Sequence, residues 1–420
     1  MIKTISLAPG ITLRCFPDDR FKHSCLSIQF LRPMRREEAA LNALIPAVLL
    51  RGTATAPDLR AITLRLDDLY GAAVGPTVRR VGDYQSVGLF SSFISDRFAM
   101  DGDQILAPMI GFLAQLLLEP ITEKGIFRRD FVAGEKKNLI AAIEAQKNDK
   151  RAYATAQMMK KMCAADSMGI PRLGETAQVK KITPEAAWTH YQAILRESPV
   201  EIFYVGEAEP ETVAQLLQPL ISRLDRDPQS LPSQTPYNPS PAGEHTETME
   251  VAQGKLAMGF VTPITIRDPE FAAMQVCNTV FGGGMTSLLF TNIREKLSLC
   301  YDIGSGYHSS KGIVAVSAGI DCDKYDTVRQ QVLEQLEICR KGEFTQEQLS
   351  AAKQALLSSL RGAHDSPGSI EGYYGNACLS GLSMTPAEYM KAVEQVTAQQ
   401  VAQAAATLRL HTGYFLKGVC

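Results

Sequence analysis

The chain has 420 residues, of which 45% are hydrophobic and 21% are charged, and its formal net charge is −2 at pH 7. This is the composition of an ordinary globular protein, long enough for two or three domains. With no global excess of basic residues, the charge argues against nucleic acid or an anionic membrane surface as the main partner. The nine cysteines are scattered without C-x-x-C spacing, so neither a disulfide framework nor a zinc knuckle is predicted.

The first residues, MIKTISLAPG, contain no apolar signal core. The longest apolar run, Ile105 to Leu118, is interrupted by Pro108, Gly111 and Gln115. It is also shorter than the roughly 20 residues that a membrane-spanning helix needs. We therefore expect a soluble protein of the reducing cytoplasm, with no membrane contact.

A helix is predicted over residues 41–50, where apolar residues precede the pair Gly52-Thr53. Pro46 lies inside this pattern and is expected to kink the helix or to mark a tighter turn. The simplest interpretation of the segment is a core helix.

The two halves of the chain resemble each other, which indicates an internal duplication. The matching segments are 27–33 with 256–263, 66–74 with 294–303, 86–95 with 313–322, 131–143 with 349–360, and 200–207 with 412–419. Each half alternates strand-like and helix-like segments in the same order, so the predicted fold class is α+β, with helices over mostly antiparallel strands. Residues 225–254 are rich in Pro, Ser, Thr and Gln and are predicted to be an exposed linker between domains at 1–224 and 255–420.

Residues 281–307 combine a glycine triplet, a helix and a tyrosine in a fixed order. Gly282, Gly283 and Gly284 form a predicted turn, and Tyr301 follows seven residues after Arg294. A guanidinium and a phenol can both donate hydrogen bonds to a developing oxyanion. Residue chemistry alone favours a plainer interpretation, in which Arg294 is a solvated helix residue, Tyr301 begins a half-buried strand and the glycines are a flexible turn.

This order resembles the second-half signature of the pitrilysin/insulinase-type zinc peptidases, which include the mitochondrial-processing-peptidase relatives. The resemblance implies a LuxS/mitochondrial-processing-peptidase-like metallohydrolase fold, in which two similar α+β domains form a half-shell that pairs with a second half-shell around a cavity. It also implies that Arg294 and Tyr301 contact the substrate carbonyl near the scissile bond. The glycine triplet would help to take in extended peptide.

The first-half signature of that family, H-x-x-E-H shortly before a Gly-Thr pair, is missing. When the chain is aligned on Gly52-Thr53, the two histidine positions fall on Ala43 and Ala47, and the position of the glutamate base falls on Pro46. Catalytic zinc needs three protein ligands, and neither alanine nor proline has a donor atom in its side chain.

The third ligand of the family is a glutamate on a later helix, and its position falls on Ala142. Glu144 lies two residues away, and a two-residue step turns the helix by about 200 degrees, so Glu144 would face the wrong side. No two of the six histidines lie within a helical turn of each other. We therefore predict no metal and no cofactor. Ser305 and His308 are close in sequence, but they lack the G-x-S-x-G pattern of a serine hydrolase.

These observations predict a subunit that is not active alone. It would form a heterodimer with a metal-bearing paralogue, or a homodimer in isolation, and would contribute half of a peptide-binding chamber for a peptide or protein substrate. The divergent first half most resembles the bacterial branch of the family associated with 5-aminopentanol modification of elongation factor P. Two alternatives remain: a non-enzymatic peptide-binding scaffold linked to that modification, and an autonomous zinc peptidase with unconventional ligands.

Overall fold

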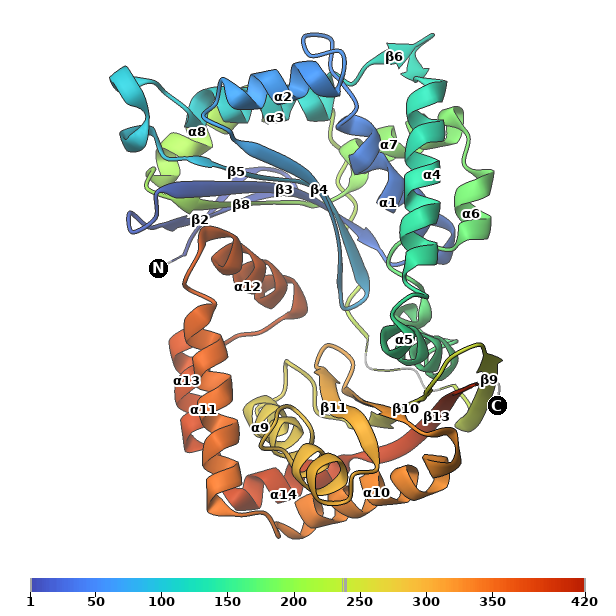
Figure 1. Ribbon diagram of the computed structural model, residues 1–420. Helices are drawn as coiled ribbons and strands as arrows, with labels where there is room; N and C mark the ends of the chain where they lie inside the picture. Colours follow the sequence, from blue (N-terminus) through green and yellow to red (C-terminus); the bar gives the residue numbers. More distant parts are fainter. Residues whose placement is uncertain (1, 236, 238–239, 419–420) are drawn as a thin grey trace. The chain divides into compact units, whose positions relative to one another are not determined.

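The computed structural model describes residues 2–235, 237 and 240–418, which fold into two compact units (Figure 1). Unit 1 is made of the described residues in 1–144, 170–233 and 364–376, and unit 2 of those in 145–169, 234–363 and 377–420. The predicted division into 1–224, 225–254 and 255–420 follows the duplication and stays a prediction. Within it, residues 1, 236, 238–239 and 419–420 lie outside the described residues.

Unit 1 is built on a six-stranded sheet with the order β1-β2-β8-β3-β5-β4. The strands are β1 (Lys3–Ala8), β2 (Ile11–Pro17), β3 (His23–Pro33), β4 (Ala73–Val81), β5 (Tyr84–Ile94) and β8 (Val200–Gly206), with a small hairpin of β6 (Thr122–Glu123) and β7 (Ile126–Phe127). The helices are α1 (Arg36–Leu49), α2 (Leu59–Asp67), α3 (Leu106–Leu118), α4 (Arg129–Ala145), α6 (Thr176–Lys181), α7 (Pro184–Glu197) and α8 (Pro210–Ile221).

The central strand β3 shows how this sheet is covered on both faces. Successive side chains of a strand point to opposite faces. Leu26, Ile28 and Phe30 belong to the main hydrophobic core, which α1, α3, α7 and α8 also line. Cys25 points the other way and packs against Ile370 of α12 (Pro367–Ser380). The sheet of unit 1 is therefore buried between a layer of helices and the first part of α12 (Figure 1).

Unit 2 is built on a five-stranded sheet with the order β11-β12-β10-β13-β9. The strands are β9 (Gly243–Met249), β10 (Gly254–Val261), β11 (Cys300–His308), β12 (Ile313–Ile320) and β13 (Arg409–Gly418). The helices are α5 (Lys150–Met162), α9 (Phe271–Phe281), the π-helix η4 (Leu289–Lys296), α10 (Tyr325–Lys341), α11 (Gln346–Gly362), α13 (Pro386–Gln395) and α14 (Ala398–Thr407). Helix α5 covers one face of the sheet, and α9, α10 and α14 cover the other (Figure 1).

The two sheets have the same topology, which supports the duplication. The order β2-β8-β3-β5-β4 in unit 1 corresponds to β9-β13-β10-β12-β11 in unit 2. Both sheets are antiparallel except for one parallel pair, which is β2 with β8 in the first and β9 with β13 in the second. The predicted α+β class with mostly antiparallel strands is confirmed.

The units exchange short segments of chain. Residues 145–169, which include α5, come from the first half of the sequence but belong to unit 2. In return, residues 364–376, which include most of α12, come from the second half but belong to unit 1. Met158 and Met162 of α5 are fully buried against strands of unit 2. Each sheet is thus covered on one face by a helix from the other half of the sequence.

Two local expectations differ from the structure. The segment predicted to be a linker contains β9, whose residues alternate between half-buried and exposed and pair with β13. All but its last residue are polar or glycine, so no apolar period signals this strand. Helix α1 continues through Pro46 as one α-helix, so the tighter turn predicted as one alternative at that residue does not form, and the predicted kink stays a prediction.

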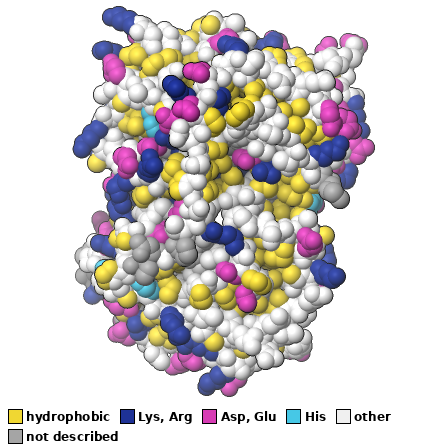
Figure 2. Space-filling model, turned by 180° about the vertical axis from the view of Figure 1, so that it is seen from behind, with side chains coloured by type: hydrophobic (Ala, Val, Ile, Leu, Met, Phe, Trp, Pro, Cys, Tyr) yellow, Lys and Arg dark blue, Asp and Glu magenta, His cyan; other side chains and the backbone are white. Residues whose placement is uncertain are grey.

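Charged side chains of both signs are interspersed over the face shown in Figure 2, in keeping with the small net charge. No helix in the described part of the chain has the length and apolarity that crossing a membrane requires.

Candidate functional site

The positions that would hold zinc in unit 1 have no donor atoms. Ala43 and Pro46 are buried in α1 and Ala47 is half-buried, while Ala142 is exposed near the end of α4. Pro46 also lacks an N–H group, so it cannot donate the helical hydrogen bond to the carbonyl of Asn42. Within the described ranges, no three His, Cys, Asp or Glu side chains gather where they could hold a metal ion. The residues present do not fit a zinc ion.

Polar groups around these positions are engaged with one another. The Asn42 side chain donates to Gln85 Oε1 (2.9 Å), and its Oδ1 lies 2.7 Å from His190 Nε2. On α4, Glu135 lies about two turns before Ala142, and its carboxylate accepts from Arg51 Nη1 at 3.1 Å. The two helices that carry these positions, α1 and α4, are therefore present. Their polar side chains contact other residues of unit 1.

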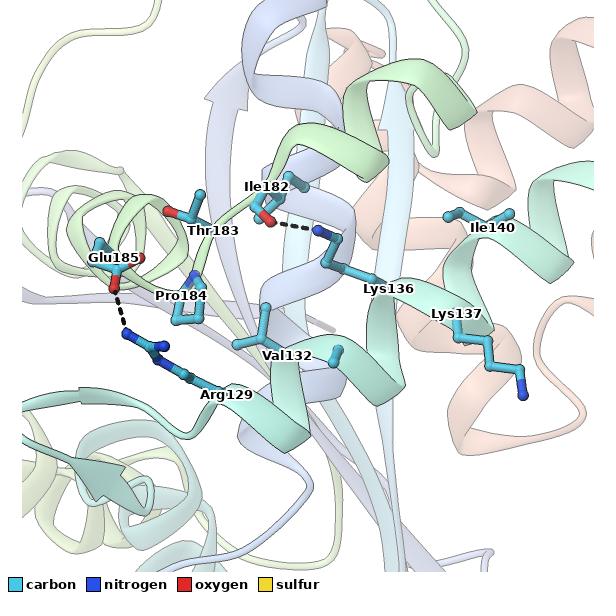
Figure 3. A pocket seen from close by; sticks show the side chains of 10 residues that line it. Arg129, Val132, Lys136, Lys137, Ile140, Ile182, Thr183, Pro184 and Glu185 are labelled. Carbon is cyan, nitrogen blue, oxygen red and sulfur yellow. Dashed lines mark hydrogen bonds and ion pairs between the residues drawn. The ribbon is translucent and has the colours of Figure 1, made fainter.

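A cavity of about 600 Å³ lies beside α4 in the same unit, and Figure 3 shows its lining. Lys136 Nζ donates to the carbonyl of Ile182 at 2.5 Å, and Arg129 lies 3.8 Å from Glu185 Oε1. Lys137 points away from both contacts. This lining combines cations with apolar side chains and offers no nucleophile paired with a base, so we assign it no catalytic role.

The glycine triplet of unit 2 lies where α9 ends against β11. The Gly282 carbonyl accepts from the backbone N–H of Ser305 at 2.8 Å. A Cβ atom on Gly282 would lie 2.6 Å from Leu289 Cδ1 and 2.6 Å from Ser305 Oγ, and one on Gly283 would lie 2.7 Å from Thr279 Cα. A Cβ on Gly284 would meet nothing within 4 Å. Close packing therefore requires the first two glycines but not the third.

These glycines form part of a cleft of about 480 Å³ that lies wholly within unit 2. Its lining comes from α5, the glycine turn, η4 and the strands β11 and β12. The lining residues are Arg151, Thr155, Gly282, Gly283, Gly284, Met285, Phe290, Ile303, Gly304, Ser305, Gly306, His308, Ala315 and Ser317. Glycines and short side chains leave its backbone accessible, which suits an extended peptide.

Strand β11 is the edge strand of this sheet, and one side of it faces away from β12. In an antiparallel pair, alternate residues direct both backbone polar groups toward the partner or away from it. Because Ser305 N–H bonds to Gly282 rather than to β12, the backbone groups of Ile303 and Tyr307 are also directed away from β12, on the side of β11 that the glycine turn contacts at Ser305. An extended peptide could add to this edge by main-chain hydrogen bonds.

Arg294 and Tyr301 lie outside the residues that line the cleft. Arg294 is on the π-helix η4, with its guanidinium 4.5 Å from the ring centre of Phe290, which does line the cleft. Tyr301 is 56% exposed, contrary to the plainer expectation of a half-buried residue. Its hydroxyl donates to Asp321 Oδ1 at 3.2 Å, and the negative charge of Asp321 raises the pKa of the phenol.

Sequence reasoning missed Arg151, which supplies the cleft with its cation. Its Nε donates to Ser317 Oγ at 2.7 Å, and its Nη1 forms an ion pair with Asp302 at 2.7 Å. The hydroxyl of Ser305 is held by Asn278 Oδ1 at 2.8 Å, so it is oriented by an amide and not by a base. These groups form no nucleophile and base pair.

Fold and sites together define a duplicated α+β protein with a peptide-sized cleft in one unit and no zinc ligands at the metal positions of the other. Residues 181–356 match the peptidase M16 inactive domain. The chain is 27% identical over 409 residues to the probable inactive metalloprotease YmfF of Bacillus subtilis (strain 168), covering 97% of this chain and 96% of that protein.

Solved structures agree with this relationship. A conserved protein from Enterococcus faecalis V583 superposes with a TM-score of 0.93 at 26% identity, covering 100% of this chain and 99% of the other. A peptidase M16 inactive domain from Pseudomonas fluorescens shares the fold with a TM-score of 0.82 at 20% identity, covering 100% and 98%. The sequence and the fold of this chain are thus similar to those of M16, or pitrilysin/insulinase-type, peptidases of the inactive kind.

Proposed function

We propose that this chain is the non-catalytic subunit of a heterodimeric zinc peptidase. In this proposal, the chain supplies a peptide-binding surface, and a paralogue that carries H-x-x-E-H supplies the metal and the base. The observation that carries the proposal is the contrast between the units: unit 1 has alanine and proline at its metal positions, while unit 2 keeps a cleft with a glycine turn and an open strand edge.

Mixing the purified chain with such a paralogue from the same organism tests the proposal. Hydrolysis of an unstructured reporter peptide should be absent with this chain alone and should rise with added chain until the two subunits are equimolar. Co-purification of the two chains should accompany this activity. A paralogue that hydrolyses the peptide at the same rate with and without this chain would contradict the proposed partnership.

The family role of Arg294 and Tyr301 gives a second test in the same assay. Both side chains present hydrogen-bond donors from the elements that flank the cleft, η4 and β11. Arg294→Ala and Tyr301→Phe should each lower hydrolysis by the mixture by roughly tenfold or more, as loss of an oxyanion donor does. Arg329→Ala, which changes an arginine on α10 outside the cleft lining, is the matched control and should leave the rate unchanged.

A second candidate function is a non-enzymatic scaffold that binds a peptide, linked to modification of elongation factor P. The observation that favours it is the cleft chemistry, because Ser305 and Ser317 are held by an amide and a guanidinium and cannot attack a peptide bond. The two functions differ in one outcome. A scaffold binds peptide without turnover even when the paralogue is present at saturating concentration.

A further inference from the structure

Arg151 reaches the cleft of unit 2 from the exchanged segment 145–169. Helix α5 begins just before it, where the Asp149 side chain accepts from the backbone N–H groups of Arg151 and Ala152. Thr155, one helical turn later, donates to the Arg151 carbonyl at 3.1 Å and lines the same cleft. The buried methionines of α5 fix the helix on the sheet, so the guanidinium is held at the cleft by a packed element.

The guanidinium is oriented but not fully used. Ser317 accepts from Nε and Asp302 accepts from Nη1, and these contacts hold the plane of the group on two sides. Nη2 lies over β11. If residue 304 had a Cβ atom, that atom would be only 3.4 Å from Nη2. Because Gly304 has no side chain, Nη2 lies close to the backbone of β11 at the floor of the cleft, where the Gly282 carbonyl oxygen is 3.2 Å from the same Cβ position. A guanidinium has five N–H donors, so several remain for a ligand.

The charge of the site indicates which ligand it would take. The Asp302 carboxylate compensates the charge of Arg151, so the pair is neutral as a whole. A neutral pair gives little attraction for an acidic side chain, yet its free N–H groups can donate to a carbonyl oxygen. The neighbouring Gly304 and Gly306 leave room for a main chain to approach.

We propose that Arg151 binds a backbone carbonyl of an extended, uncharged peptide segment laid along β11, and that Asp302 sets the preference against acidic segments. Arg151 is then a positioning residue for the substrate, supplied to the second-half cleft by the first half of the sequence. This inference rests on the proposed peptide-binding function and names the ligand chemistry of the same cleft.

The test measures peptide affinity of the full chain by fluorescence anisotropy. The probes are a short labelled peptide of alanine, serine, glycine and valine, and the same peptide with several glutamates. Arg151→Ala should weaken binding of the neutral peptide by about tenfold or more, the effect of losing a charge-assisted hydrogen bond. Arg151→Lys should bind with intermediate affinity, because an ammonium cannot keep both Asp302 and Ser317 while reaching the peptide.

Asp302→Asn gives a readout that a purely structural role would not change. It leaves Arg151 without its counter-charge, so binding of the glutamate peptide should tighten relative to the neutral one, and the gain should vanish at high salt. Equal affinity of the unaltered chain and Arg151→Ala for the neutral peptide would overturn the inference and leave the heterodimer proposal standing. No binding of either peptide by the unaltered chain would overturn the peptide cleft itself. Thermal unfolding of each variant verifies that it is folded.

Discussion

At the scale of single residues, the least exposed carboxylate described in unit 1 is that of Glu371, near the start of α12. Its Oε1 accepts from Ser27 Oγ (2.7 Å) and Gln29 Nε2 (2.6 Å), and Arg79 Nη1 lies 2.9 Å from both carboxylate oxygens. The side chain of Glu371 is fully buried, while that of Arg79 is 35% exposed. This carboxylate joins the exchanged helix to the polar face of β3.

Removing this carboxylate should destabilise unit 1. Glu371→Ala leaves the Ser27 hydroxyl without its carboxylate acceptor and Gln29 Nε2 with Ser27 Oγ as its remaining acceptor beneath α12, at a cost of about 2–3 kcal/mol. Limited proteolysis at increasing urea concentration measures the unfolding of unit 1. The urea concentration at the midpoint of this transition should therefore fall. Glu144→Ala, at an exposed position near the end of α4, is the control. Equal midpoints for the two variants would show that Glu371 does not stabilise the docked helix.

His190 lies between charged groups of three elements. Burial lowers its pKa from 6.5 to about 4, and the nearby Arg32 on β3 adds to this, while Glu38 on α1 and Glu197 on α7 oppose it. Arg32 is itself shared by the two glutamates, at 2.9 and 3.0 Å. The neutral imidazole is therefore the form that the folded protein holds against Asn42.

This shift predicts how stability depends on pH. Between the folded pKa of about 4 and the unfolded value of 6.5, the unfolded chain binds more protons at His190, so stability falls as the pH falls through this window. His190→Gln removes the titration and should lose less stability than the unaltered chain between about pH 7 and about pH 5. His23→Gln, at an exposed position, should behave like the unaltered chain. Identical pH profiles for all three proteins would contradict this role.

Residue types predicted some members of the site and could not predict others. The glycine triplet lines the cleft of unit 2, and its predicted contact with peptide stays a prediction. The substrate roles of Arg294 and Tyr301 stay predictions, because neither side chain lines that cleft. Arg151 could not be found from sequence, because it lies about 130 residues before the glycine turn and only the exchange of α5 brings the two together.

At the scale of elements, the glycine turn and the π-helix η4 form one connected unit. Leu297 donates to the Asn292 carbonyl five residues earlier at 3.1 Å, the wider spacing that defines a π-helix. Such segments are uncommon and often occur at functional sites. The sequence predicted a helix here, but its periodicity could not distinguish the π form from an α-helix. Leu289 of η4 packs where Gly282 has no side chain.

Two glycines of the turn should respond differently to substitution. Gly282→Ala forces a methyl group against Leu289 and Ser305 and should cost about 1–3 kcal/mol through overpacking. It should also weaken peptide binding, because the turn and β11 must separate. Gly284→Ala meets open space and is the matched control for stability, although Gly284 also lines the cleft. The midpoint of unfolding measures the first effect and the anisotropy assay the second, and equal midpoints of the two variants would show that the turn tolerates a side chain at Gly282.

Strand β9 shows why other elements escaped prediction. Its segment, GEHTETM, is nearly all polar, and the strand forms because it completes the edge of the second sheet beside β13. Tertiary pairing, which no local pattern reports, decides its conformation. Helix α1 is the opposite case, since its apolar burial keeps it helical through Pro46 despite the lost hydrogen bond.

At the scale of the whole molecule, the duplication was the strongest signal in the sequence. Matching segments of the two halves fold into matching strands, including the central pair β3 and β10, and the two sheets share one order. The exchange of α5 and α12 could not be predicted, because internal similarity shows which segments of the two halves correspond but not which of the two units each segment packs in.

We infer that the chain carries no catalytic metal of its own. The zinc content of the purified chain, washed free of loosely bound ions, tests this inference. We expect far less than one zinc per chain and no peptide hydrolysis by the chain alone. One retained zinc per chain, together with hydrolysis that a chelator abolishes, would contradict it.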